Sequence, residues 1–445
     1  MSDSVTLAHG RDGLRLSPPA DLDVTVLSEP GLPALEGGTR AIEEALETPL
    51  GSDPIEILAR GRQSACILVP DRTRGCPRTL ALPPLLRRLK AAGLGPEKVE
   101  ILAASGLHAP SGADEIKTLI GEIVARDWRV SASDARDESQ FVDLSTDSAA
   151  APMRLHRRWV GADLRVIVSL VEPHLLAGYS GGAKMILPGV ADVATIRHAH
   201  RPAIVGHPAS QGGQMRENPL VALTQRAALA TPVDFHLATA VNGSGALTGA
   251  WAGSLRAAHS AAIARVAGGS RVEVSRPFDA VVTSGGGWPL DRSLYQSLKG
   301  LTTGARITRR DGPVWLVAPC DEGPGSADFH RILSQVDGPE SFFALIGDPD
   351  FFSIDQWMAQ HLYSVARDHP VIVQAQALPE VLDRAWLRGR GLTVVSSEQE
   401  GWDALRSHLD AGKGRVGVLP RGPHTLAVCA GDPVDTELPP VDERE

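Results

Sequence analysis

Histidine, lysine, arginine and aspartate side chains follow short apolar runs of this sequence, at positions that a ligand could reach. They are Asp71, Arg74, His108, His174, Lys184 and His200. Two neutral imidazoles, with an ordinary pKa of about 6.5, form a natural general acid and base at physiological pH. If one imidazole faces each side of a carbon centre, the pair suits a symmetrical reaction such as racemisation or epimerisation. The guanidinium of Arg74 and the ammonium of Lys299 suit a substrate carboxylate.

The densest group of such residues lies in the stretch EPHLLAGYSGGAKMILPGVADVATIRHAH, from Glu172 to His200. His174 precedes a glycine-rich turn, Lys184 follows it, and a helical segment then carries His198 and His200. Because residues two apart on a helix point to nearly opposite sides, we expect only one of these two histidines to face the same space as His174. His200 is available as a metal ligand, yet no second or third ligand follows at a conventional spacing. The P-loop, dinucleotide-binding and zincin templates all fail here.

Each of these side chains also has a structural interpretation, which the sequence leaves open. Asp71 could cap a helix, His108 could be a satisfied loop residue, and Lys184 could be a solvated surface charge. Trp357 is by default a core aromatic. The histidines that are more typical of structural positions are His198, His207, His236 and His259.

Three buried strands are predicted to position the candidate residues, at 65–69, 99–104 and 164–171. Each strand is followed by a polar or glycine-containing loop and then by a helix. The first two of these helices are expected at 79–92 and 113–125. This alternation predicts a mainly parallel sheet with helices on its faces. Ligands of such sheets bind outside the carboxyl ends of the strands, so three separate loops should converge on one site.

A second alternation begins after Gly268-Gly269 and predicts a smaller domain. Its first strand, 279–283, leads into a triple glycine and then into a helix that bears Tyr295, Gln296 and Lys299. Further strands are expected at 314–318, 370–374 and 392–396, with helical stretches that include 327–336 and 354–367. The predicted fold class is α/β, with two domains that are each a mainly parallel sheet flanked by helices, and with the active site in the cleft between them.

The predicted domain boundaries follow from these two alternations. Residues 1–269 would form the domain with the histidines, and residues 270–415 the smaller domain. Residues 416–445 would contain a final strand at 425–429, which could return to either sheet, and a disordered acidic tail.

Length and composition limit the functional classes. A chain of 445 residues exceeds what one hydrophobic core usually supports, and 43% hydrophobic with 22% charged residues is typical of a globular protein. A net charge of −9 argues against a broad surface for nucleic acid or anionic membrane. The 4 cysteines show no CxxC spacing, so neither a disulfide framework nor a cysteine-rich zinc site is expected. No signal peptide or membrane span is apparent, so we expect a cytoplasmic enzyme.

Six motifs together resemble the lactate racemase family. They are DRTR…P at 71–77, SGLHAP at 105–110, EPH with GYSGGAK at 172–184, RHAH at 197–200, SGGGWPLD…LYQSLKG at 284–300 and DQW at 355–357. Their order and separation match the family's pattern from the first motif to the last. The resemblance implies two α/β domains and a nickel-pincer nucleotide, which is a pyridinium bis-thiocarboxylic acid mononucleotide that carries nickel.

The resemblance also implies a role for each matching residue. Lys184 would hold the cofactor covalently, and His200 would be the protein ligand to nickel, with the remaining ligands supplied by a carbon and two sulfurs of the cofactor. His108 and His174 would be the acid/base pair. The substrate would be bound or oriented by Arg74, Tyr295, Gln296 and Lys299, and the cofactor would be lined or seated by Asp71, Thr73, Gly181, Gly182 and Trp357. Proteins that synthesise or deliver the cofactor would be partners.

The reaction that the resemblance implies is inversion at C2 of a 2-hydroxy acid by hydride transfer. One histidine removes the hydroxyl proton while the hydride passes to the cofactor, and the hydride then returns to either face of the planar 2-keto acid. Arg72 stands where the family commonly has histidine, so a third positive charge could favour a substrate larger or more acidic than lactate, or contact the cofactor phosphate.

Two other functions remain open at this point. One is net redox chemistry on a hydroxy or sugar acid with the same cofactor, which would require an external electron acceptor. The other is non-catalytic carriage of the cofactor, against which the presence of both His108 and His174 argues, because carriage needs no acid/base pair.

Overall fold

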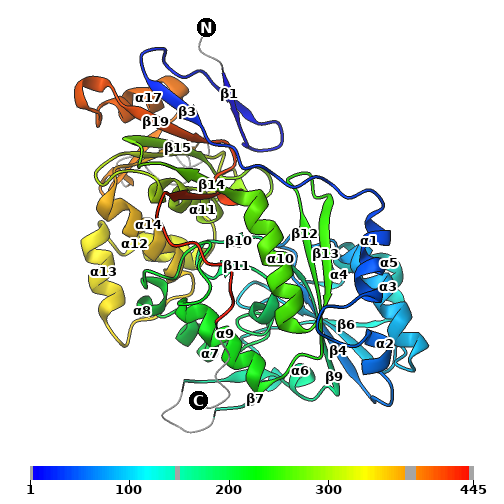
Figure 1. Ribbon diagram of the computed structural model, residues 1–445. Helices are drawn as coiled ribbons and strands as arrows, with labels where there is room; N and C mark the ends of the chain where they lie inside the picture. Colours follow the sequence, from blue (N-terminus) through cyan, green and yellow to red (C-terminus); the bar gives the residue numbers. More distant parts are fainter. Residues whose placement is uncertain (1–3, 146–150, 376–386, 440–445) are drawn as a thin grey trace. The chain divides into compact units, whose positions relative to one another are not determined.

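The computed structural model describes residues 4–145, 151–375 and 387–439, and the chain forms two compact units (Figure 1). Unit 1 comprises residues 1–30 and 270–433, and unit 2 comprises residues 31–269 and 434–445. The ends of the chain differ from the prediction, because the first 30 residues belong to the unit of the later strands and not to that of the histidines.

Unit 2 is built on a six-stranded sheet whose order is β13-β12-β9-β4-β5-β6. These strands are β4 (Ala65–Pro70), β5 (Val99–Ala104), β6 (Arg129–Ala132), β9 (Leu164–Leu170), β12 (Phe235–Val241) and β13 (Leu247–Gly253). All neighbouring pairs are parallel except β12 and β13. The prediction of a mainly parallel sheet is confirmed.

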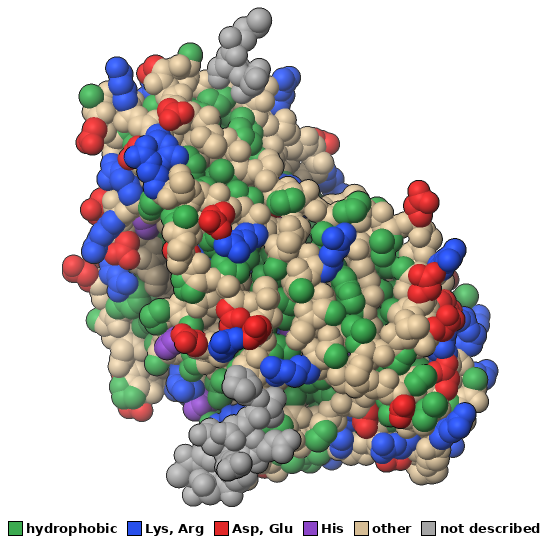
Figure 2. Space-filling model, viewed as in Figure 1, with side chains coloured by type: hydrophobic (Ala, Val, Ile, Leu, Met, Phe, Trp, Pro, Cys, Tyr) green, Lys and Arg blue, Asp and Glu red, His purple; other side chains and the backbone are tan. Residues whose placement is uncertain are grey.

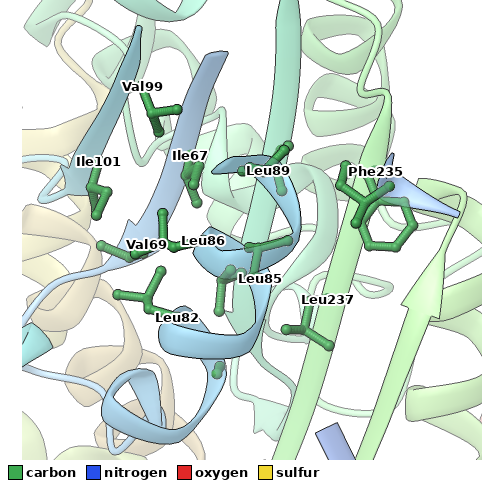
Figure 3. Close-up of a cluster of buried hydrophobic side chains, with 14 of the residues drawn as sticks. Ile67, Val69, Leu82, Leu85, Leu86, Leu89, Val99, Ile101, Phe235 and Leu237 are labelled. Atoms are coloured by element: carbon green, nitrogen blue, oxygen red, sulfur yellow. The ribbon is translucent and has the colours of Figure 1, made fainter. Parts of the chain in front are cut away.

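Helices cover both faces of this sheet, which explains why its central strands are apolar along their whole length. Leucines of α3 (Arg78–Ala91) pack on Ile67, Val69 and Ile101, as Figure 3 shows, with α1 (Gly38–Glu47) in the same core. His236 of β12 points to the opposite face, where its ring contacts His259 of α10 (Leu255–Ser270). The predicted helix 113–125 is in fact two helices, α4 (Ala113–Ile120) and α5 (Glu122–Asp127). They are separated at Gly121, whose φ of 88° is unfavourable for other residues.

The strand order of unit 2 places a topological switch point between β4 and β9. From β4 the chain moves outward to β5 and β6, and it then returns to the other side of β4 to form β9 and β12. Loops that leave the carboxyl ends of β4 and β9 therefore diverge to opposite faces. A crevice at such a point is the usual ligand site of an open α/β sheet.

Unit 1 contains a second six-stranded sheet, in the order β18-β17-β16-β15-β19-β3, in which all neighbours are parallel. Its strands are β3 (Asp23–Val26), β15 (Ala280–Ser284), β16 (Val314–Val317), β17 (Val371–Gln374), β18 (Leu392–Val395) and β19 (Arg415–Leu419). Its helices are α11 (Leu294–Arg306), α12 (Ala327–Ser334), α13 (Pro339–Gly347), α14 (Gln356–Asp368) and α17 (Glu398–Arg406). The predicted α/β fold class with two flanked sheets is confirmed.

Shorter elements complete the described chain. In unit 1 they are β1 (Val5–Leu7), β2 (Leu14–Leu16), β14 (Arg271–Val274) and β20 (Leu426–Cys429). In unit 2 they are α2 (Ile55–Leu58), β7 (Phe141–Asp143), β8 (Arg154–His156), α6 (Arg157–Val160), β10 (Pro173–His174), β11 (Gly178–Tyr179), α7 (Val193–Ala199), α8 (Pro202–Val205) and α9 (Pro219–Ala230).

The C-terminal part of the chain requires two corrections. The last strand, β20, pairs with β14 of unit 1 and joins neither main sheet. The residues that follow are not disordered up to 439, because Arg256 donates hydrogen bonds to the carbonyl groups of Leu438 and Pro439 and the backbone N–H of Arg216 donates to Asp435. The rest of the predicted tail, 440–445, lies outside the described residues.

Charged side chains of both signs are intermixed on the visible face of the molecule (Figure 2). Over α1 and α3, for example, Arg88 makes ion pairs with Glu43, Glu47 and Glu56. Within the described residues, none of the helices is both long and apolar enough to span a membrane.

Candidate active site

Asp71 is the first residue after β4, and its carboxylate organises the loop that follows. The side chain is 5% exposed. Its Oδ1 accepts hydrogen bonds from the backbone N–H and the hydroxyl of Thr73, at 3.1 and 2.7 Å. Burial alone would raise the pKa of Asp71, but the hydrogen bonds from His108 and Thr73 and the positive charge of Arg74 outweigh it, so the pKa lies below its ordinary value. The carboxylate is therefore ionised at neutral pH.

His108 lies in the loop after β5, and Asp71 fixes the orientation and tautomer of its ring. Nδ1 of His108 is 2.7 Å from Oδ2 of Asp71. Because the ionised carboxylate can only accept, Nδ1–H must donate. The neutral ring then carries a lone pair at Nε2, on a side chain that is 50% exposed. This arrangement of carboxylate and imidazole prepares Nε2 to accept a proton.

His174 lies at the end of β10 and is held in the opposite tautomer. Its Nδ1 accepts hydrogen bonds from the backbone N–H groups of Leu176 and Ala177, at 3.2 and 3.1 Å. The neutral ring must therefore carry its hydrogen at Nε2. The neutral rings of His174 and His108 thus carry their hydrogens at different nitrogens, Nε2 in His174 and Nδ1 in His108.

The glycine turn before Lys184 is fixed against the buried side of the sheet. The carbonyl of Ser180 accepts a hydrogen bond from Nε2–H of the buried His259, at 2.9 Å. A Cβ atom at Gly181 would lie 2.7 Å from Oγ of Ser169, and one at Gly182 would lie 2.2 Å from Nδ1 of His259. Both glycines are therefore required by close approach, and both also have positive φ. His259 has the structural position that the sequence predicts, but it supports the candidate site directly.

The two histidines near the end of α7 differ in their hydrogen bonds. Nδ1–H of His200 donates to the carbonyl of Ile196 at 3.0 Å, so the neutral ring carries its lone pair at Nε2. Nε2 of His198 instead accepts a hydrogen bond from Arg201, at 2.7 Å. The two side chains thus serve different purposes, in agreement with their spacing of two residues.

Burial and Lys184 together keep His200 neutral. The side chain is buried, and this burial, partly opposed by the hydrogen bond to Ile196 and reinforced by the positive charge of Lys184, lowers the pKa of His200 to about 4. Among the described residues, no three His, Cys, Asp or Glu side chains are grouped so that they could hold a metal ion, so a metal at His200 would take its other ligands from elsewhere.

Two arginines of the loop after β4 form ion pairs with different glutamates. Nη1 of Arg74 is 2.5 Å from Oε1 of Glu172, which follows β9 across the switch point. Nη1 of Arg72 is 2.6 Å from Oε1 of Glu115 on α4. The third positive charge that the sequence suggested for a larger or more acidic substrate is therefore matched by a carboxylate of the same unit.

In unit 1, the candidate residues Tyr295 and Trp357 belong to one hydrogen-bond network. The hydroxyl of Tyr295 donates to Oδ1 of Asp355 at 3.0 Å and accepts from Nε1–H of Trp357 at 3.2 Å. Ser326 donates to the other carboxylate oxygen of Asp355. Trp357 is therefore not a simple core aromatic. Asp355 has a left-handed backbone with φ of 69°, which is uncommon for a residue other than glycine and often marks a functional constraint.

Gln296 and Lys299 follow Tyr295 on the same helix, α11. The buried Oε1 of Gln296 has no hydrogen-bond partner within the part of the chain that the structure describes. A buried acceptor in this state is a candidate for binding a ligand group.

The sequence did not assign roles to Glu172, Asp355 or His259. Glu172 and Asp355 stand inside recognised motifs, beside His174 and Trp357, and this proximity was the available signal. His259 gave no signal, because it is distant in sequence from the turn that it supports.

Comparison with known proteins agrees with this arrangement. Residues 9–213 match the lactate racemase N-terminal domain, and residues 274–412 match the lactate racemase C-terminal domain. A lactate racemase from Thermoanaerobacterium thermosaccharolyticum is 31% identical over 334 residues, which are 75% of this chain and 78% of the relative. This chain belongs to the lactate racemase family.

Other relatives extend the comparison. A lactate racemase from Lactiplantibacillus plantarum is 30% identical over 74% of this chain and 78% of its own length. The structure of the lactate racemase apoprotein from T. thermosaccharolyticum superposes with a TM-score of 0.87 at 26% identity, and covers 96% of this chain and 100% of that one. A crystal structure of a protein from Thermotoga maritima, at 16% identity and a TM-score of 0.64, covers 91% of this chain and 100% of that one and shares the fold alone.

Proposed function

We propose that this chain inverts C2 of a 2-hydroxy acid. Membership of the lactate racemase family supports a racemase, and hence an isomerase, as the class of enzyme. The observation that carries the finer proposal is the opposite hydrogen bonding of the two imidazoles, in which Nδ1 of His108 donates and Nδ1 of His174 accepts. Removal of a hydroxyl proton beside a forming carbonyl requires one acceptor and one donor in these states.

Each histidine then has a defined task at Nε2. His108 takes the hydroxyl proton, and the Asp71 carboxylate stabilises the imidazolium that results. His174 donates an Nε2–H hydrogen bond to the carbonyl oxygen as it forms, as a neutral imidazole held in this tautomer by backbone N–H groups. For the opposite enantiomer, His108 would be the imidazolium, which donates at Nε2 while its Nδ1–H keeps the contact with Asp71, and His174 would be the base. His174 can take this task only if its Nδ1 releases the backbone donors of Leu176 and Ala177 and carries the ring hydrogen instead.

The residues around Lys184 fit the nickel-pincer nucleotide that the family resemblance implies. His200 is buried and neutral with its Nδ1–H bonded to Ile196, and Gly181 and Gly182 let the backbone before Lys184 approach its neighbours closely. These features suit one metal ligand and one covalently attached ring. His200 would be the ligand to nickel, Lys184 would be the attachment point, and Asp71, Thr73, Gly181, Gly182 and Trp357 would seat or line the nucleotide. When bound, the cofactor would supply the acceptor and donor of hydride. Proteins that make or deliver the cofactor would be its partners.

The substrate carboxylate would be bound by Arg74, whose guanidinium provides paired N–H donors. From unit 1, Lys299 would contribute a second cation, and Tyr295 and Gln296 would contribute hydrogen bonds to the substrate. The hydroxyl of Tyr295 donates to Asp355 and accepts from Trp357, and these two hydrogen bonds would hold the side chain in place.

The acid/base assignment can be tested with protein purified from cells that make the cofactor. His108→Ala and His174→Ala should each lower the rate of racemisation by roughly 10²–10⁴-fold, with cofactor loading unchanged. The exposed His207 provides a matched control, and His207→Ala should leave the rate unchanged. If either active-site variant retains near-normal rates, the two-histidine mechanism is wrong. Net formation of a keto acid would instead indicate redox chemistry, and a loaded protein without turnover on any 2-hydroxy acid would indicate a carrier.

The covalent attachment has a separate test. Intact-mass spectrometry of the loaded protein should reveal an adduct that is absent from Lys184→Ala and present in Lys98→Ala, a control at a partly exposed lysine. An adduct of unchanged mass in Lys184→Ala would contradict the assignment.

A further inference from the structure

We propose that Glu172 is a positioning residue that joins the substrate arginine to the turn of the cofactor lysine and offsets the charge of that arginine. The proposal rests on the function proposed above, and it concerns a residue to which the sequence assigned no role. Two sets of hydrogen bonds support it, one through the backbone of Glu172 and one through its carboxylate.

The backbone of Glu172 is tied to the first residue of the glycine turn. The backbone N–H of Glu172 donates to Oγ of Ser180 at 3.0 Å, and the backbone N–H of Ser180 donates to the carbonyl of Glu172 at 2.9 Å. The hydroxyl of Ser180 in turn donates to the carbonyl of Leu170 at 2.9 Å. The end of β9 and the turn that leads to Lys184 therefore form one hydrogen-bonded assembly.

The side chain of Glu172 extends this assembly across the switch point to the loop after β4. Its carboxylate binds Arg74, and the two side chains are 30% and 25% exposed. The backbone of Arg74 is held as well, because its carbonyl accepts a hydrogen bond from Nη2 of the buried Arg78 at 3.1 Å. With both ends fixed, the carboxylate sets where the guanidinium of Arg74 lies relative to the turn before Lys184.

The ion pair between Glu172 and Arg74 also determines how much positive charge this side of the site presents. A partly buried pair is screened less by water than an exposed pair, so the carboxylate offsets much of the charge of Arg74. Nη1 is the nitrogen of Arg74 that contacts Glu172, so Nε and Nη2 would be its donors toward a ligand carboxylate. The positive charge of Arg74 also acts on the carboxylate of Asp71. The positive charge of Arg72 is paired with the carboxylate of Glu115. This side of the site is therefore prepared for one carboxylate and gives no added attraction for a second.

Replacement of the carboxylate by an amide separates this charge effect from a purely structural role. Glu172→Gln keeps the length and a hydrogen-bonding oxygen but removes the negative charge that is paired with Arg74. A dicarboxylate should gain more than a monocarboxylate from the freed charge. Glu115→Gln is the matched control, because it makes the same change of charge beside the neighbouring Arg72, where the side chains are 42% and 56% exposed.

The experiment compares kcat/KM for malate with kcat/KM for lactate in the loaded wild type and in both variants. Glu172→Gln should raise the ratio of malate to lactate by about tenfold, the effect of one unit charge acting at short range in a partly solvated site. Glu115→Gln should change the ratio less than about twofold, and the shift should vanish in the double variant Arg74→Gln/Glu172→Gln. Intact mass should show equal cofactor loading throughout.

The role of Glu172 can be tested even if the protein proves not to be a racemase. Calorimetric dissociation constants of lactate and malate for the unloaded protein require no turnover, and their ratio should shift in the same way. An equal ratio in Glu172→Gln and Glu115→Gln, by kinetics or by binding, would overturn the role of Glu172. Absence of racemisation in the wild type would instead contradict the proposed function and leave the binding comparison to decide the role of Glu172.

Discussion

Asp71→Asn should leave the candidate site with two hydrogen-bond donors and no proton acceptor. In the wild type, Oδ1 of Asp71 accepts from both the N–H and the hydroxyl of Thr73, while Oδ2 faces Nδ1 of His108. The oxygen of an asparagine would keep the two Thr73 donors, so its NH₂ group would point at His108. The amide would then donate to Nδ1, and the hydrogen of the neutral ring would move to Nε2.

The expected loss of rate follows from the hydrogen bond that is lost and the one that replaces it. Loss of a charge-assisted bond that favours the active tautomer costs about 1.5–3 kcal/mol, and the new neutral bond favours the inactive tautomer by about 0.5–1.5 kcal/mol. Together they shift the tautomer equilibrium by about 2–4.5 kcal/mol, which corresponds to a rate loss of roughly 30- to 2,000-fold. The site is buried at Asp71, so solvent provides little relief.

Two measurements check this prediction. The initial rate of racemisation, corrected for cofactor loading by intact mass, should fall within the stated range in Asp71→Asn. Nitrogen-15 NMR of His108 should find Nε2 without a hydrogen in the neutral wild type and with one in the variant. A variant whose rate stays within about threefold of the wild type at equal loading would refute the reasoning, because the assigned tautomer would then have no consequence for the rate.

Three further predictions concern other parts of the molecule. His200→Ala should abolish nickel binding in elemental analysis of loaded protein while His198→Ala keeps it, and the reverse result would mean that the other histidine is the ligand. Asp355→Asn keeps a left-handed backbone but replaces one hydrogen-bond acceptor by a donor. Because this disturbs the hydrogen bond that holds Tyr295, KM should rise several-fold with little change in kcat. An unchanged KM in steady-state kinetics would contradict a role of this hydrogen-bond network in substrate binding. Burial is the first cause that lowers the pKa of three histidines, to about 4, 3 and 4 for His156, His236 and His259. Their neutral state is fully stabilising above pH about 6.5, so the free energy of unfolding of the apoprotein should fall as pH drops toward about 4. The expected fall is up to about 1.4 kcal/mol per pH unit for each histidine. Urea titrations that give the same free energy of unfolding over this range would be inconsistent with neutral burial.

The sequence predicts the central strands of the first sheet well but misses β3 and β19 of the second. The strands at 65–70, 99–104 and 164–170 are covered by helices on both faces, so each reads as a continuous apolar run. β3 is a four-residue strand with a largely exposed pattern, and its partner β19 lies near the other end of the chain. Short edge strands of this kind depend on a long-range pairing that local patterns do not record.

In the candidate site, the sequence predicts which residues take part but not which hydrogen bonds they make. That the loops after β4 and β5 meet could be predicted from strand order, and the structure does bring Asp71 and His108 together. The opposite tautomers of His108 and His174 could not be predicted, because they depend on a carboxylate in one case and on two backbone N–H groups in the other. The neutralisation of Arg72 likewise depends on Glu115, a residue of a separate helix.

The most direct test of the central claim starts from a single enantiomer of a 2-hydroxy acid that carries deuterium at C2. With loaded enzyme, the optical rotation should decay to zero from either enantiomer, and mass spectrometry should find the deuterium retained at C2 in both products, since it would move as a hydride that does not exchange with water. A rotation that never changes, or a product that loses its deuterium to solvent, would contradict racemisation by hydride transfer in this protein.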